Sequence, residues 1–207
     1  MFTKITKEGF SDTYKQFEAQ NYATVISESD KYITMFDGEA IVPKFEFLKA
    51  VANARLFGFE AYKKAINFIA LNYPNSPEGK QAEGMMQSVI PLLEKKSFVD
   101  ESTSTNFKVI YSFIDVTDNE IDEFIKILNE NIKDIKYYDL TSSKDKYNTN
   151  TTFVVVHGIK SFQGAQGFND ILKDYKKNID KDHFAISSDN YEVIQIHKNL
   201  EAYLESQ

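Results

Sequence analysis

The spacing of hydrophobic residues changes near the middle of the chain. Up to about residue 95, apolar side chains recur every three or four positions, as they do on one face of an α-helix. From Phe107 onward, short apolar stretches with strand-like alternation are interleaved with further segments of helical spacing. The pattern therefore predicts an α+β protein whose first half is helical.

Helix starters and breakers define five expected helices in the first half. Pro91 lies inside the last of them and is expected to kink it or to shift its start, because proline has no backbone N–H to donate. The expected helices run from Ser11-Asp12 to Gln20-Asn21, from Tyr22 to Asp37-Gly38, from Pro43 to Gly58, through Tyr62 and Ile69 to Tyr73-Pro74, and from Glu78 to about Lys95.

An internal similarity supports a helical repeat. Segments 22–26 and 62–66 share the pattern Tyr-x-x-small-Ile at a separation of 40 residues. Tetratricopeptide repeats have a period of about 34 residues and carry a similar pattern in their second helix. In the second copy, Ala65 is the small residue expected to let two helices pack closely. The alternative is an irregular helical bundle. Because repeats stack on their neighbours, we expect the array to continue upstream in a longer protein.

A polar segment separates the two halves. Residues 97–106 lack helical periodicity and lie between an apolar helix and an apolar strand, as an interdomain linker does. We therefore predict a tetratricopeptide-like helical domain over residues 1–98 and a separate α+β domain over residues 106–207.

The second half predicts the order β-α-β-β-α-β followed by two short helices. Thr117 and Glu120 form a capping box at the start of the first helix, and residues 141–151 are expected to form a hairpin loop. This order is that of a ferredoxin-like domain, with both helices on one face of an antiparallel sheet and the second and fourth strands at its edges. The expected strands are 107–114, 135–140, 153–159 and 183–187; the second helix is 161–178, and the terminal helices are 188–196 and 200–204.

Charge and composition exclude several classes of partner. Residues 1–100 carry 12 basic and 13 acidic side chains and residues 101–207 carry 12 and 18, which gives −1 and −6 and the total of −7. The acidic second domain is poorly suited to bind nucleic acid or anionic lipid. The sequence has no cysteine, no apolar run long enough to span a bilayer and no signal-peptide core at residues 1–10.

No motif with catalytic or metal-binding spacing is present. His157, His183 and His197 lack partners at metal-ligand spacing, and we expect His157 and His183 to lie at solvated strand ends. The acidic residues at 115–123 are explained by the positive end of a helix dipole rather than by calcium. Gly164-Ala165-Gln166-Gly167 lacks the lysine of a phosphate loop. We therefore expect no catalytic residue, no cofactor and no metal.

The second half resembles the carboxy-terminal end of the SprE/PorW family, large tetratricopeptide lipoproteins of the Bacteroidetes associated with gliding motility and type IX secretion. The most telling piece is Phe184-x-Ile186-Ser187-Ser188-x-Asn190-Tyr191, followed by Leu200-x-x-Tyr203-Leu204. The other pieces are Phe107-Lys108-Val109-Ile110-Tyr111, Tyr138-Asp139-Leu140 and Thr152-Phe153-Val154-Val155-Val156. The resemblance implies a periplasmic protein held at the outer membrane by a lipid on a cysteine that this sequence lacks.

Three functional hypotheses follow. The first is a non-catalytic scaffold that captures secretion or motility proteins along its helical groove or at an exposed edge of its sheet. The second is a peptidoglycan-binding module that uses Tyr and Asn side chains on an open face of the sheet. The third is an enzyme, which a dense cluster of unusually titrating residues in a deep pocket would favour. The candidate binding residues are Tyr137, Tyr138 and Asn190, chosen for exposure and turn chemistry.

Overall fold

The structure is a computed structural model that describes residues 2–135, 139–175, 177 and 179–207. Contacts within the chain divide it into two compact units. One unit consists of Met1–Lys96 with Ile196–Lys198, and the other of Ser97–Gln195 with Asn199–Gln207. Together they form an α+β protein in which helical hairpins precede an antiparallel sheet with interspersed helices.

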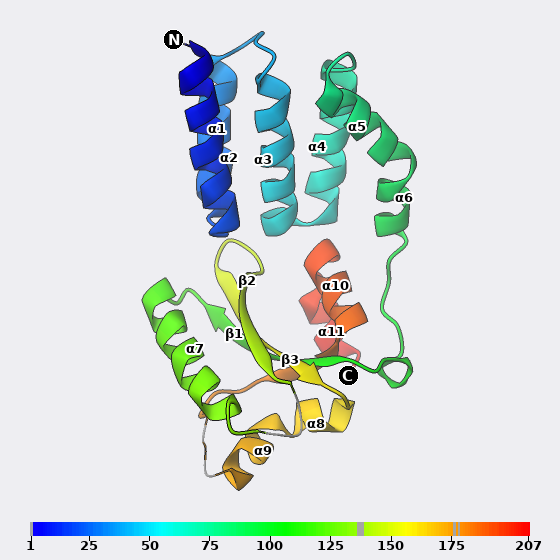
Figure 1. The fold of residues 1–207 in the computed structure, drawn as a ribbon. Coiled ribbons are helices and arrows are strands. Elements are labelled where there is room, and N and C mark those ends of the chain that lie inside the picture. The colour runs from blue at the N-terminus through cyan, green and yellow to red at the C-terminus, as the bar shows by residue number, and fades with distance from the viewer. Residues whose placement is uncertain (1, 136–138, 176, 178) are drawn as a thin grey trace. The chain divides into compact units, whose positions relative to one another are not determined.

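The first unit is built from helices that pack pairwise on their chain neighbours (Figure 1). Two hydrophobic clusters hold them together. One joins α1, α2 and α3 around Val25 and Leu48, and the other joins α3, α4 and α5 around Ile66 and Ile69. The helices are α1 (Phe2–Glu18), α2 (Tyr22–Met35), α3 (Val42–Phe57), α4 (Phe59–Asn72), α5 (Pro77–Gln87) and α6 (Val89–Glu94).

Two of these helices differ from the expectation. α1 begins at Phe2, well before Ser11. The expected fifth helix is divided into α5 and α6 at Ser88. The reason is Pro91, which has no N–H to donate to the carbonyl group of Gln87 four residues earlier. The predicted kink is therefore a complete break between two helices.

The second unit contains a four-stranded antiparallel sheet with the strand order β2-β3-β1-β4. β1 and β3 are central, and β2 and β4 are the edge strands, as predicted. The strands are β1 (Phe107–Ile114), β2 (Thr141–Lys146), β3 (Thr151–Ile159) and β4 (Phe184–Ser187). The helices are η1 (Glu101–Thr103), α7 (Asp118–Ile132), α8 (Phe162–Gln166), α9 (Phe168–Asp174), α10 (Ser188–His197) and α11 (Leu200–Glu205).

The predicted capping box of α7 is confirmed. The Thr117 hydroxyl oxygen accepts a hydrogen bond from the Glu120 backbone N–H at 3.4 Å, and the Glu120 carboxylate accepts one from the Thr117 N–H at 3.2 Å. Each side chain thus satisfies a backbone donor that the helix leaves without an intrahelical partner.

The predicted position of the second strand is wrong. β2 comprises Thr141–Lys146, which we expected to be a loop, while Ile135, Asp139 and Leu140 lie outside any strand and residues 136–138 lie outside the described part of the chain. β2 is polar because it is an edge strand held partly by side chains of α7. Lys144 forms ion pairs with Asp118 and Asp122 at 2.9 and 2.8 Å.

The single helix predicted for residues 161–178 is also wrong. It is divided into α8 and α9 at Gly167. Ser161 caps α8 by accepting a hydrogen bond from the Gly164 N–H at 3.1 Å. Ala165, Phe168 and Leu172 face the core, each no more than 1% exposed.

Both faces of the sheet are covered, so the open face assumed by the peptidoglycan hypothesis is wrong. α7, α8 and α9 cover one face, where Val109 and Val156 are fully buried. On the other face, Tyr191 and Ile194 of α10 and Tyr203 of α11 belong to the hydrophobic cluster formed by alternate residues of the strands. These terminal helices cover the face of the sheet that this hypothesis assigned to the glycan.

Candidate protein-binding surface

A shallow groove of about 350 Å³ runs between α3 and α4. It is lined by small, aromatic and charged side chains together. From α3 come Glu46, Lys49 and Asn53, and from α4 come Ala61, Lys64, Ala65 and Phe68. This groove is the candidate site for a peptide partner.

The floor of the groove follows from the spacing of two alanines. Ala61 and Ala65 are four residues apart, so they lie on one face of α4. Ala65 also packs against the cluster formed by Ile66 and Ile69. The predicted small residue therefore contributes both to the core of the unit and to a hollow on its surface.

Opposite charges fix one wall of the groove. Lys49 lies 2.8 Å from the carboxylate of Glu46, which is 7% exposed, and 3.0 Å from that of Asp30. Partial burial acts to lower the pKa of Lys49, but hydrogen bonds to these two carboxylates outweigh it and hold that pKa above its ordinary value. The positive charge of Lys49 is thus balanced by two carboxylates, whereas the Lys64 side chain on the other wall is exposed.

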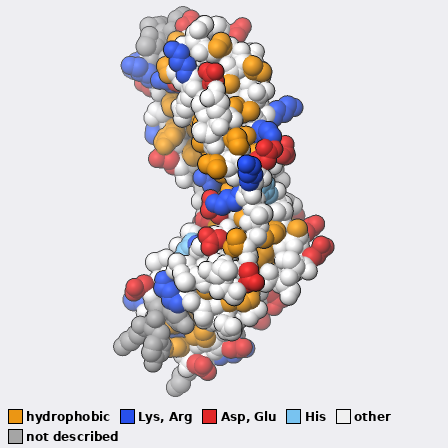
Figure 2. Space-filling view, turned by 90° about the vertical axis from the view of Figure 1, so that its right-hand side faces the viewer, with side chains coloured by type: hydrophobic (Ala, Val, Ile, Leu, Met, Phe, Trp, Pro, Cys, Tyr) orange, Lys and Arg blue, Asp and Glu red, His pale blue; other side chains and the backbone are white. Residues whose placement is uncertain are grey.

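Exposed apolar side chains lie on the helices of this unit. Phe68, which borders the groove, is 45% exposed, and Leu71 on the next turn of α4 is 71% exposed. Leu92 of α6 is 72% exposed. On the side of the unit seen in Figure 2, small groups of hydrophobic side chains lie between charged ones. Apolar groups flanked by charges are common at protein interfaces, although single exposed residues are also normal.

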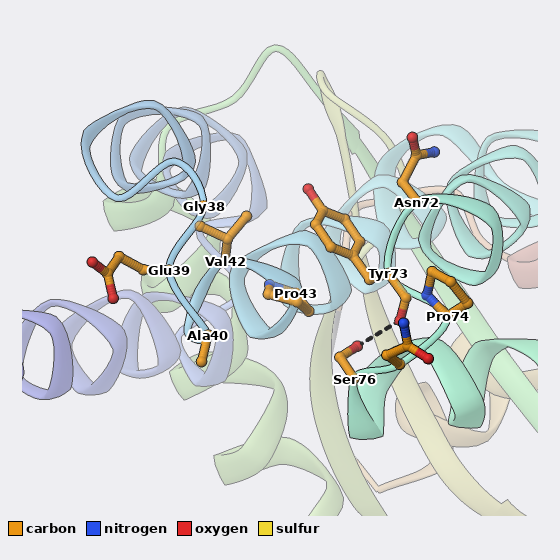
Figure 3. A pocket seen from close by; sticks show the side chains of 10 residues that line it. Gly38, Glu39, Ala40, Val42, Pro43, Asn72, Tyr73, Pro74 and Ser76 are labelled. Atoms are coloured by element: carbon orange, nitrogen blue, oxygen red, sulfur yellow. Dashed lines mark hydrogen bonds between the residues drawn. The ribbon is translucent and has the colours of Figure 1, made fainter.

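A second hollow, of about 380 Å³, lies where the loop before α3 meets the loop between α4 and α5 (Figure 3). The rings of Pro43, Tyr73 and Pro74 border it. The second loop is fixed locally, because the Ser76 hydroxyl donates to the Tyr73 carbonyl at 2.9 Å and also caps α5 by accepting from the Gly79 N–H at 2.9 Å. We regard this hollow as a consequence of loop packing.

The exposure expected for Asn190 is wrong. Its side chain is 1% exposed. The side-chain oxygen accepts from the Val99 N–H at 2.9 Å, and the side-chain nitrogen donates to the Val99 carbonyl at 2.9 Å and to Glu101 at 3.0 Å. Asn190 therefore fastens the segment before β1 to α10 and has no surface for a ligand. Tyr137 and Tyr138 lie outside the described residues.

The outer edge of β4 is partly occupied. The Glu101 carboxylate accepts a hydrogen bond from the Ser187 N–H at 3.0 Å, and the Tyr203 hydroxyl donates to the Ala185 carbonyl at 2.9 Å. The Ser188 N–H donates to Asn106, in the segment leading into β1, so the backbone groups of Ser188 point toward β1. Because the backbone groups of successive residues in a strand point to opposite sides, the Ser187 N–H and the Ala185 carbonyl group face away from β1. Strand addition at β4 would have to displace both side chains.

A cluster of polar residues that the sequence did not reveal lies on the α10 side of the sheet. His157 is half-buried, with Lys108 2.9 Å from its Nδ1 and the Ser143 hydroxyl 2.8 Å from its Nε2. The expectation of a solvated strand end is therefore wrong for His157. His183 directly precedes β4 and is half-buried, and its Nε2 donates to the backbone carbonyls of Ala165 and Gln166. Only the strand register brings 108, 143 and 157 together.

The geometry at His157 does not match a Ser–His nucleophile. The Lys108 ammonium can only donate, so it requires an acceptor at Nδ1 and leaves the imidazole proton on Nε2. Nε2 then donates to the Ser143 oxygen and cannot take the serine proton.

Within the described ranges, no group of three or more His, Asp or Glu side chains is arranged to hold a metal ion. Asp118 and Asp122, in the acidic segment before and within α7, are paired with Lys144. Of the helices in the described part of the chain, none combines the length and the hydrophobicity needed to cross a bilayer.

Comparison with known proteins adds no assignment. No protein-family model matches the sequence, and no curated protein matches it significantly.

Proposed function

We propose that this chain is a non-catalytic protein-binding scaffold of the bacterial cell envelope, and that it belongs to the gliding and type IX secretion machinery. The first unit is a tetratricopeptide-like array, and the second is a ferredoxin-like domain. The strand order β2-β3-β1-β4 and the connections β1-α7-β2-β3-α8-α9-β4 support the second assignment. The placement in a cell-envelope machine rests on the resemblance of residues 106–207 to the SprE/PorW family.

The observation that carries the binding role is the groove between α3 and α4. Ala61 and Ala65 leave room for an incoming side chain, and Phe68 offers a partly exposed aromatic wall. Aromatic side chains contribute strongly to binding, because they bury a large area at a small entropic cost.

The charges of the groove define the partner segment that we propose. Lys49 is neutralised by Glu46 and Asp30, while Lys64 is exposed beside Phe68 on the same helix, four residues away. A complementary segment carries an aliphatic or aromatic side chain for the alanine floor and a carboxylate for Lys64. We therefore propose that the groove captures an acidic, amphipathic segment of another secretion or motility protein.

The test is an affinity capture with the purified protein from solubilised envelope of a gliding, type IX-competent bacterium, followed by mass spectrometry. We expect secretion or motility proteins to be retained. The double variant Lys64→Glu/Phe68→Ser should lose them, because it reverses the charge and removes the aromatic wall. Leu92→Ser, which removes a more exposed apolar side chain of α6 outside the groove, is the control and should retain them.

Two outcomes contradict the proposal. If the groove variant retains the same proteins as the wild type, the partner binds elsewhere. If no protein is retained and the purified chain instead sediments with peptidoglycan sacculi, the chain is a glycan-binding module. Both variants change exposed residues, so circular dichroism should show unchanged helix content in each.

A further inference from the structure

The polar cluster around His157 joins three strands and a helix. His157 of β3 contacts Lys108 of β1 and Ser143 of β2 through its two ring nitrogens. The Lys108 ammonium also lies 5.4 Å from the centre of the Tyr191 ring of α10. The Tyr191 hydroxyl donates to the Asp145 carboxylate of β2 at 2.6 Å. Lys108 is thus placed between an imidazole and an aromatic ring that belongs to a different layer.

The charged groups that face His157 come from two strands. Lys108 on β1 is a direct neighbour, and Asp145 on β2 is the carboxylate whose charge acts on the imidazole. From α10 come the Tyr191 ring and hydroxyl and the neutral amide of Gln195, which donates to that hydroxyl at 2.9 Å. Partial burial and the Lys108 charge hold the pKa of His157 below its ordinary value, against a smaller opposing effect of Asp145.

We propose that His157 is a pH-sensitive switch. In its neutral form it holds Lys108 against the Tyr191 ring and keeps α10 on the sheet. In its protonated form it repels Lys108 and loosens α10. Protonation converts Nδ1 from an acceptor into a donor that faces an ammonium at 2.9 Å. The Nε2 bond to Ser143 keeps its direction, so the ring stays fixed and Lys108 moves. The contact that is lost is the one between β1 and α10.

The loosening has a defined pH window. A histidine whose pKa is depressed in the folded state binds its proton more readily in the open state, where the pKa is higher. Opening is therefore favoured as the pH falls from about 6.5, the ordinary value of an imidazole, to the depressed folded value. In this window the equilibrium constant for the opening of α10 should rise by up to about tenfold for each unit by which the pH falls.

The experiment measures amide hydrogen exchange in α10 between pH 7.5 and pH 4.5, corrected for the intrinsic pH dependence of exchange. We expect protection of α10 to fall with pH in the wild type, while α7 on the opposite face of the sheet is unaffected. His157→Gln is the matched variant, because its amide can accept from Lys108 and donate to Ser143 but cannot titrate. Its α10 protection should be independent of pH. The same acid loss in His157→Gln as in the wild type would overturn the proposal.

A second variant keeps the proposal testable if His157→Gln does not fold. Lys108→Met removes the like charge, so the imidazole of His157, followed by NMR, should titrate at a higher pH than in the wild type. Protonation of His157 should then leave α10 protected. An unchanged His157 titration in Lys108→Met, or a wild-type α10 that keeps its protection through the His157 titration, would also overturn it.

Discussion

The Tyr203 hydroxyl donates to the Ala185 carbonyl oxygen at 2.9 Å, so a side chain from the terminal helix α11 occupies the outer edge of β4. The same hydroxyl lies 2.5 Å from the carboxylate of Glu101, which in turn accepts from the Ser187 N–H. Tyr203 is 1% exposed. The short edge strand is thus closed by two side chains, which removes backbone groups that would otherwise offer a template for pairing.

Removing this hydroxyl should destabilise the second unit. Tyr203→Phe keeps the ring in its cluster but takes the hydroxyl away from the Ala185 carbonyl and from the Glu101 carboxylate, which keeps its bonds from Ser187 and Asn190. We expect a loss of about 1–3 kcal/mol in the free energy of unfolding, the usual cost of an unsatisfied buried polar group. Urea denaturation at pH 7 would measure it. Tyr14→Phe, at a position that is 46% exposed, is the control and should change stability by less than about 0.5 kcal/mol. Equal effects of the two substitutions would contradict this role of the Tyr203 hydroxyl.

The same residue predicts a loss of stability at alkaline pH. Burial, and then the hydrogen bond and charge of Glu101, raise the pKa of Tyr203 well above its ordinary value. The folded state therefore keeps the phenolic proton at a pH where the unfolded chain has lost it. This contribution is complete below about pH 10 and is lost as the pH rises further, by up to about 1.4 kcal/mol per pH unit.

Unfolding measured at pH 9, 10 and 11 tests this sign. The wild type should lose stability more steeply with pH than Tyr203→Phe, which has no phenolic proton at this position. Burial also raises the pKa of Tyr111, so the variant should keep part of the slope. Parallel pH profiles for the two proteins would show that the ionisation of Tyr203 is not coupled to folding.

The sequence predicts best those elements whose signals are local. The capping box at Thr117 and Glu120 lies within one turn, and the effect of Pro91 reaches only to Gln87. β2 was missed because it has no hydrophobic alternation. Its polar residues form a strand only because β3 supplies backbone partners and α7 supplies carboxylates for Lys144.

The exposure expected for Asn190 fails for a related reason. Asn190 has turn chemistry in the sequence, but its partners Val99 and Glu101 lie about 90 residues earlier in the chain. Likewise, the contact between Lys108 and His157 depends on the register of β1 against β3. Long-range pairing of this kind leaves no trace in local spacing, so burial and function at such positions could not be predicted from the residues alone.

The capping box predicts a measurable stability difference. Thr117→Ala should cost about 1 kcal/mol, because the Glu120 N–H loses its side-chain acceptor at the start of α7. Thr117→Ser keeps a hydroxyl at the cap and should cost much less. Denaturation of the three proteins under identical conditions tests this order. A serine variant as unstable as the alanine variant would show that the threonine methyl group, rather than the cap, is responsible.

Two glycines of α5 predict opposite effects of one substitution. A Cβ added at Gly79 would lie 1.8 Å from the Tyr73 carbonyl oxygen, so Gly79→Ala must displace the loop that precedes α5. A Cβ added at Gly84 would meet no atom within 4 Å. Because alanine is the better helix former, Gly84→Ala should stabilise the helical unit by about 0.5–1 kcal/mol.

Gly79→Ala should instead destabilise this unit by about 1–3 kcal/mol, the range typical of forced backbone shifts in a packed site. The Ser76 cap is part of the reason, since the Gly79 N–H donates to its hydroxyl at 2.9 Å and moves with the backbone. Thermal unfolding of the wild type and the two variants tests this difference, because the two variants have the same composition and differ only in the position of the added alanine. If both substitutions raise the midpoint temperature of unfolding, the Tyr73 loop moves aside at little cost, and the close contact between α5 and this loop does not limit stability.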